Sequence, residues 1–118
     1  MLERKPNIIL EKSIAFALLV ITYCEKLETN KKYVIANQLL KSGTSIGASI
    51  HEAQNAESKA DFIHKLKIAA KELEETKYWI MLYEHSENYE NPKELKERVN
   101  ELGLILYKIL STSYKSKK

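Results

Sequence analysis

The stretch Leu39–Ile80 constrains the fold most, because its apolar residues recur every three or four positions over two successive segments. This spacing places apolar side chains on one face of an α-helix. Between the segments, Ser58 is a good N-cap, and Asp61 sits at the third helical position, where a carboxylate complements the free N–H groups and the helix dipole. The stretch therefore predicts two helices joined by a very short turn.

The flanking sequence predicts two more helices. Asn7 offers a cap for one, and Asn91 followed by Pro92 is a standard helix opening. The chain has only 3 glycines and 2 prolines, too few turn residues for a β-rich fold. We expect one domain spanning residues 1–118, with helices at about 8–28, 33–55, 59–85 and 92–113 and a frayed basic tail at 114–118. Short loops between matched helices favour antiparallel neighbours, so the predicted fold is an all-α, up-down-up-down four-helix bundle.

Two features of the first two helices predict close packing. The run Ile14–Cys24 is almost wholly apolar but too short to cross a bilayer, which takes about 20 apolar residues. We expect it to be a buried helix of a cytoplasmic protein, with Cys24 as a small buried side chain.

Gly43 and Gly47 lie inside the second helix, where each costs about 1 kcal/mol relative to alanine. We expect the backbone of another helix to approach closely there; the alternative is that the helix merely tolerates two poor helix formers.

The third helix is apolar on two sides. Its main stripe includes Leu66 and Leu73, and a second patch projects from a different side. One stripe suffices for the core of a bundle, so the second patch needs its own cover, and another copy of the chain is the simplest one. The alternative is that Trp79 lies flat on its own subunit. The candidate subunit-interface residues are Ile68, Trp79, Leu82 and Tyr83.

Catalytic and metal-binding patterns are missing from the sequence. A di-metal carboxylate site in a four-helix bundle needs Glu-x-x-His pairs, and the nearest sequence, Asp61 to His64, uses an aspartate that is needed as a cap. His51 and Glu52 are adjacent, so they point about 100° apart on a helix and do not converge on one substrate atom. We therefore expect no enzyme, no metal and no cofactor.

Basic residues offer a binding surface, although the net charge is only +3. Lys67 and Lys71 lie one turn apart on the outward side of the third helix. Repetition around a ring of subunits would multiply their positive field. Glu75 lies four residues after Lys71, so ordinary surface pairing is the alternative. The candidate nucleic-acid-binding residues are Lys41, Lys59, Lys67, Lys71, Lys115, Lys117 and Lys118.

A family resemblance covers the second and third helices. Its features are Ser45-Ile46, Ile50-x-Glu52, Ser58-x-x-Asp61-Phe62, Leu66, Ile68-Ala69, and Glu72–Glu75 before Tyr78-Trp79. In this order they resemble the four-helix-bundle family named for proteins encoded in intervening sequences of bacterial 23S ribosomal RNA genes. The resemblance implies a bacterial cytoplasmic protein that forms a ring-like homopentamer without known catalysis.

The chain is also similar to the accessory variability proteins of diversity-generating retroelements, which are basic pentamers that bind nucleic acid and assist a reverse transcriptase. It departs from the usual pattern at Ala53, where a glycine often stands, and in lacking an arginine near Ala56. Two hypotheses follow. The first is a non-enzymatic homo-oligomer that binds RNA or DNA by phosphate neutralisation. The second is a scaffold or accessory subunit for a separately encoded enzyme, such as a reverse transcriptase, with no nucleic-acid binding of its own.

Overall fold

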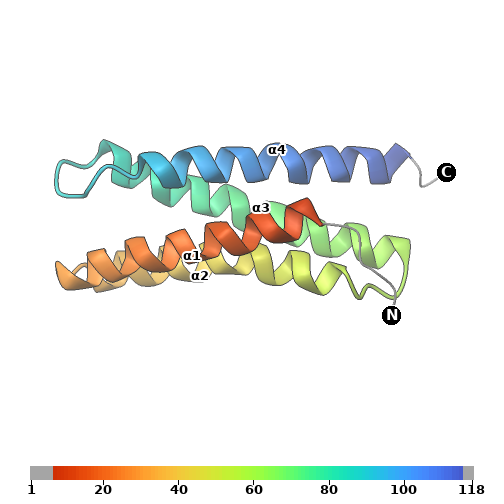
Figure 1. Ribbon diagram of the computed structural model, residues 1–118, viewed down its shortest axis with the longest axis horizontal. Helices are drawn as coiled ribbons and strands as arrows, with labels where there is room; N and C mark the ends of the chain where they lie inside the picture. Colours follow the sequence, from red (N-terminus) through yellow and green to blue (C-terminus); the bar gives the residue numbers. More distant parts are fainter. Residues whose placement is uncertain (1–6, 116–118) are drawn as a thin grey trace.

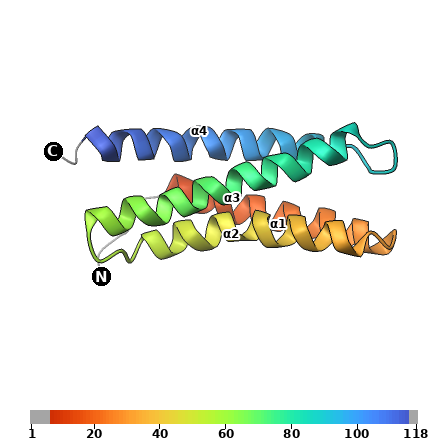
Figure 2. The same ribbon diagram turned by 180° about the vertical axis from the view of Figure 1, so that it is seen from behind.

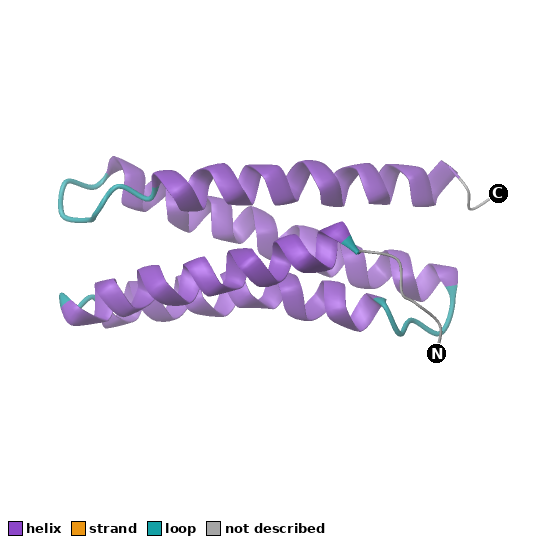
Figure 3. Cartoon of the chain, in the orientation of Figure 1, coloured by secondary structure: helices purple, strands orange, loops and turns teal. Residues whose placement is uncertain are grey.

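The computed structural model describes residues 7–115, and all regular structure within this range is helical (Figure 3). The elements are α1 (Ile8–Thr29), α2 (Tyr33–Ala53), α3 (Lys59–His85) and α4 (Lys93–Lys115). α2 ends at Ala53 rather than near residue 55. α4 continues to Lys115, which corrects the expected fraying at residues 114 and 115. Lys117 and Lys118 lie outside the described residues.

The helices lie side by side, with their connections at alternate ends (Figure 1). The α1–α2 and α3–α4 connections lie at one end, and the α2–α3 connection lies at the other end with the start of α1 and the end of α4. Within the described residues each helix has two neighbours: α1 packs on α2, α2 on α3, α3 on α4, and α4 most sparsely on α1. Figure 2 shows α3 running obliquely from the α2 side toward α4. The prediction of an all-α protein with four helices is confirmed over residues 7–115.

Both predicted N-caps are confirmed. The Asn7 side chain accepts a hydrogen bond from the N–H of Leu10 at 3.2 Å. Ser58 Oγ accepts from the N–H of Asp61 at 3.0 Å, and the Asp61 carboxylate accepts from the N–H of Glu57 at 3.1 Å. The bond from the Glu57 N–H stabilises the ionised carboxylate and is the main reason why the pKa of Asp61 is lowered. These bonds set the point at which α3 begins.

The glycines of α2 face α1, as expected. A Cβ at Gly43 would lie 2.9 Å from Val20 Cγ2, and a Cβ at Gly47 would lie 3.6 Å from the backbone oxygen of Ser13. The close approach of the α1 backbone is therefore confirmed at Gly47, while at Gly43 the nearest atoms of α1 are those of the Val20 side chain. At Gly43 the space is too small for a methyl group without movement of Val20, which is itself fully buried.

The expectation that the run Ile14–Cys24 is buried is wrong for its outer face. Phe16 and Val20 lie in the core, but the side chains of Ile14 and Leu18 are 52% and 60% exposed. The reason is that α1 packs extensively on α2 but only sparsely on α4, which leaves its outer side largely uncovered within the described residues. No described helix is long and apolar enough to cross a membrane.

Two small polar side chains lie inside the bundle. Ser42 of α2 is fully buried. Its Oγ lies 3.0 Å from Thr76 Oγ1 of α3, within hydrogen-bond distance, and Thr76 Oγ1 donates to the carbonyl oxygen of Glu72 at 2.7 Å. Burying a hydroxyl group costs little free energy when it has a hydrogen-bond partner. Ser42 therefore does not interrupt the extensive contact between α2 and α3.

Candidate nucleic-acid interface

A groove of about 520 Å³ lies between the first half of α3 and the second half of α4. It brings Lys67 and Lys71 of α3 together with two tyrosines of α4, Tyr107 and Tyr114. The groove is lined by Lys67, Ala70, Lys71, Glu74, Tyr107, Leu110, Ser111 and Tyr114. Two cations, two aromatic rings and an apolar floor thus share one surface.

The polar contacts in this groove are few. Lys67 Nζ lies 5.8 Å from the centroid of the Tyr114 ring, near the outer limit of a cation–π contact. The Tyr107 hydroxyl donates to Glu74 Oε2 at 2.5 Å. Burial, and then this bond to an acidic partner, raises the pKa of Tyr107 to about 12. Tyr107 therefore remains a neutral hydrogen-bond donor at physiological pH.

Neither lysine forms an ion pair within residues 7–115. Glu75, the expected partner of Lys71, does not pair with it, and the carboxylate of Glu74 lies near Lys77 Nζ (3.8 Å) as well as the Tyr107 hydroxyl. The surface pairing expected from the spacing in the sequence is therefore not formed. The two ammonium groups are exposed on one side of α3.

Three other predicted basic residues, all within residues 7–115, do not join this groove. Lys41 lies in the middle of α2, Lys59 is the first residue of α3, and Lys115 is the last residue of α4. All are exposed, and none of them lines the groove. Among the candidate residues that the structure describes, only Lys67 and Lys71 are brought together.

Sequence reasoning missed the two tyrosines. Tyr107 and Tyr114 are seven residues apart, which places them on the same face of a helix. That spacing was the available signal. It was overlooked because the apolar stripe of α4, which includes Val99 and Leu102, accounts for the core without them.

The structure removes one residue, Tyr83, from the candidate subunit interface on α3. Ile68 and Leu82 are 38% and 41% exposed, as an uncovered patch requires. Trp79 is half-buried, and its indole nitrogen is buried without a hydrogen-bond partner in the described part of the chain. Tyr83 is only 1% exposed, so its assignment to a subunit interface is wrong.

Tyr83 belongs to the core because α2 and α1 enclose it. Its hydroxyl donates to the carbonyl oxygen of Ile35 at 3.0 Å, and its ring centroid lies 5.8 Å from that of Tyr23. In the sequence, helical periodicity places Tyr83 between the main apolar stripe of the third helix and its second patch. The position of α2 decides that it points inward.

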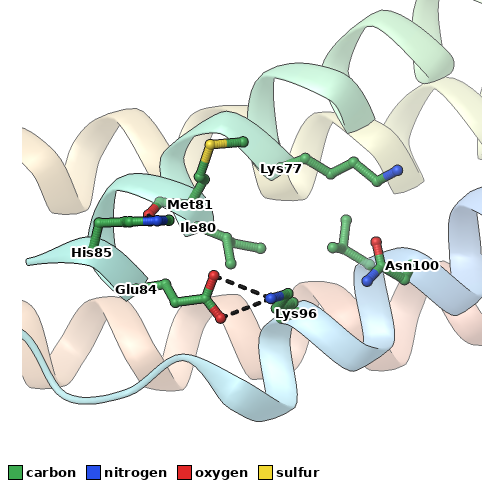
Figure 4. A pocket seen from close by; sticks show the side chains of 8 residues that line it. Lys77, Ile80, Met81, Glu84, His85, Lys96 and Asn100 are labelled. Atoms are coloured by element: carbon green, nitrogen blue, oxygen red, sulfur yellow. Dashed lines mark hydrogen bonds and ion pairs between the residues drawn. The ribbon is translucent and has the colours of Figure 1, made fainter.

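A second hollow, of about 340 Å³, lies near the α3–α4 connection (Figure 4). The carboxylate of Glu84 accepts two hydrogen bonds from Lys96 Nζ, at 2.8 and 3.1 Å. His85 Nδ1 lies 2.9 Å from the carbonyl oxygen of Met81, on the rim of the hollow. These polar groups are engaged locally and do not converge on one point, so the hollow has no arrangement of a nucleophile and a base.

The fold and its surfaces define a helical-bundle protein with a mixed basic and aromatic groove. The chain belongs to the family of 23S rRNA-intervening sequence proteins, whose family model matches residues 5–108. This confirms the resemblance seen in the second and third helices.

A solved structure of a protein of unknown function from Bacteroides thetaiotaomicron VPI-5482, from the S23 ribosomal protein family, is similar to the chain. The two are 38% identical with a TM-score of 0.82, over 86% of this chain and 97% of that one. Comparison with curated proteins finds no match.

Proposed function

We propose that the protein is a non-enzymatic homo-oligomeric ring that binds RNA or DNA through basic residues repeated around it. The observation that carries the proposal is the pair Lys67 and Lys71, whose ammonium groups are exposed and form no ion pair within residues 7–115. Phosphates that approach such a pair release counterions, which favours binding without any reading of sequence. The family to which the chain belongs is named from ribosomal RNA genes, which is consistent with an RNA ligand.

Two unlike apolar surfaces support a ring. One is the α1 surface, formed by Ile14, Leu18 and Ile21, and the other is the α3 surface, formed by Ile68, Trp79 and Leu82. The two helices are not neighbours in the described part of the bundle, so the surfaces face different directions. A contact between the α1 surface of one copy and the α3 surface of the next is heterologous, and repeated contacts of this kind close into a ring when the rotation allows it. Five copies is the number that the family resemblance implies. Connections at alternate ends support the up-down-up-down order within each copy.

A salt titration tests nucleic-acid binding. We expect a labelled RNA to bind the wild-type protein at low salt, and log K to fall linearly with log salt concentration. The double variant Lys67→Glu and Lys71→Glu should lose most of the affinity and flatten this slope. Lys108→Glu is the matched control, because Lys108 is exposed on α4 and does not line the groove. Absence of binding at low salt, or equal loss in the control, would refute the proposal.

A second candidate function is a scaffold or accessory subunit for a separately encoded enzyme, such as a reverse transcriptase. The exposed residues Ile14 and Leu18 favour it, because a protein partner can cover the same apolar surface as a second copy. In that case the product of a neighbouring gene should co-purify with the protein. The double lysine variant should retain this partner while Leu18→Glu loses it.

A further inference from the structure

We propose that the α3–α4 groove binds single-stranded nucleic acid by stacking unpaired bases on Tyr107 and Tyr114. This inference rests on the proposed function and names its substrate class. Phosphate neutralisation alone favours the duplex, whose charge density is higher, whereas the groove adds aromatic faces beside the lysines that only unpaired bases can use. Positive grooves with aromatic side chains are the usual means by which proteins hold single strands without sequence preference.

The geometry of α4 sets out two stacking positions on one face. Tyr107 and Tyr114 lie two helical turns apart, about 10 Å along the axis. Their side chains are 41% and 45% exposed, so part of each ring is open to solvent. Ala70 of α3 and Leu110 of α4 also line the groove and give it an apolar floor. Stacking of flat, apolar base faces on this surface would remove it from water, which favours binding.

The charges divide the groove into a side for phosphates and a side for bases. Lys67 and Lys71 line the α3 side and attract the backbone of a strand. Glu74 repels phosphates, but its carboxylate already accepts the Tyr107 hydroxyl, which keeps it near the α4 side. A strand is therefore held with its backbone along the lysines and its bases over the tyrosines.

A base that binds in the groove would replace the Lys67 ammonium at the Tyr114 ring. In the free protein its ammonium lies 5.8 Å from the Tyr114 ring, a weak contact for an exposed pair. A base that stacks on Tyr114 displaces this ammonium, which is then free to bind the phosphate of the same strand. In a duplex the base faces are already stacked on one another and cannot reach the rings.

The test measures the affinity of the full chain at low salt for two ligands of equal length, a labelled oligothymidylate and an unlabelled duplex. We expect the single strand to bind more tightly. Tyr114→Leu should weaken the single strand by at least about fivefold, since stacking is worth about 1–3 kcal/mol per base, and leave the duplex unchanged. Tyr114→Phe keeps the ring and should retain the wild-type affinity. Tyr33→Leu is the control, because Tyr33 is an exposed tyrosine at the start of α2 and does not line the groove.

The outcomes separate this inference from the proposed function. If the duplex binds at least as tightly as the single strand and Tyr114→Leu changes neither, while Lys67→Glu weakens both, then stacking is refuted and phosphate binding stands. If no nucleic acid binds at low salt, both fail. If Tyr114→Leu loses binding but Tyr114→Phe loses it equally, the hydroxyl rather than the ring is responsible, and the stacking inference is wrong.

Discussion

At the scale of single residues, burial decides the chemistry of Cys24. Its side chain is 2% exposed, and its Sγ donates to the carbonyl oxygen of Ala36 at 3.4 Å. Desolvation, with a smaller contribution from Glu28, raises the pKa of the thiol to about 12. The thiol is therefore protonated at any physiological pH and is a packing residue, as the sequence indicates.

Cys24 should react very slowly with thiol reagents in the native protein. The raised pKa lowers its thiolate fraction about a thousandfold at pH 8 relative to an ordinary cysteine, and burial blocks access as well. Labelling with iodoacetamide, followed by mass spectrometry, should give no adduct in native protein and complete labelling in denaturant. Rapid labelling of the native chain would show that α1 and α2 separate readily.

Asp61 should make the start of α3 sensitive to acid. Its folded-state pKa is lowered, chiefly by the hydrogen bond from the Glu57 N–H. A lowered pKa stabilises the folded state at pH values above the ordinary aspartate value of 3.8. This contribution is lost as the pH falls through the lower, folded-state pKa.

Asp61→Asn tests this dependence. The variant should be less stable than the wild type at neutral pH, and the difference should disappear below pH 3.8 as the wild-type carboxylate becomes protonated. Urea unfolding followed by circular dichroism, at several pH values, measures it. A difference that does not change with pH would assign the effect to side-chain shape instead of charge.

At the scale of helices, the α1–α2 contact depends on one glycine more than on the other. Both glycines lie within α2, and alanine at either would gain about 1 kcal/mol of helix propensity. At Gly43 a new Cβ would lie 2.9 Å from Val20, a stiff and fully buried side chain. At Gly47 the shortest distance would be 3.4 Å, to Ser13 Oγ, which is ordinary contact.

Gly43→Ala should therefore destabilise the protein, while Gly47→Ala should be neutral or stabilising. Overpacking costs about 1–3 kcal/mol, which outweighs the gain in propensity only at Gly43. Chemical denaturation of both variants measures the difference. Adding Val20→Ala to Gly43→Ala should cost less than Val20→Ala costs the wild type, because the new methyl group occupies part of the space. Equal stability of the two single variants would contradict the packing argument.

At the scale of the whole molecule, the two apolar surfaces can be tested separately. Leu18→Glu disrupts the α1 surface and Leu82→Glu the α3 surface, and both side chains are exposed, so the fold should tolerate either change. If the contact is heterologous, each variant alone should be monomeric at 13.7 kDa. Mixed together, the two variants should form a heterodimer, because each retains the surface that the other has lost.

Light scattering of the variants and their mixture measures these masses. Val34→Glu is the control, since Val34 is exposed on α2 and belongs to neither surface. If Leu82→Glu alone still assembles, the α3 surface is not an interface. If the wild-type protein is monomeric at all working concentrations, the ring is refuted.

Local features of this chain could be predicted from sequence. Helix starts at Asn7 and Ser58, the α2 glycines and the burial of Cys24 all depend on residues within one or two turns or on strong side-chain preferences. Family membership was also visible, because its matching residues lie in one continuous stretch that folds as α2 and α3. For these features, the chemistry of neighbouring residues is sufficient.

Other features were decided by the tertiary structure. Which side of α1 remains exposed depends on how sparsely α4 covers it, and the inward position of Tyr83 depends on where α2 lies. The groove of Lys67 with Tyr114 depends on the oblique course of α3 between α2 and α4, which brings together residues far apart in the chain. The sequence by itself determined the helices and their apolar faces, because these follow from periodicity. The tertiary structure alone decided which faces meet, because that depends on the order and crossing of helices around the core.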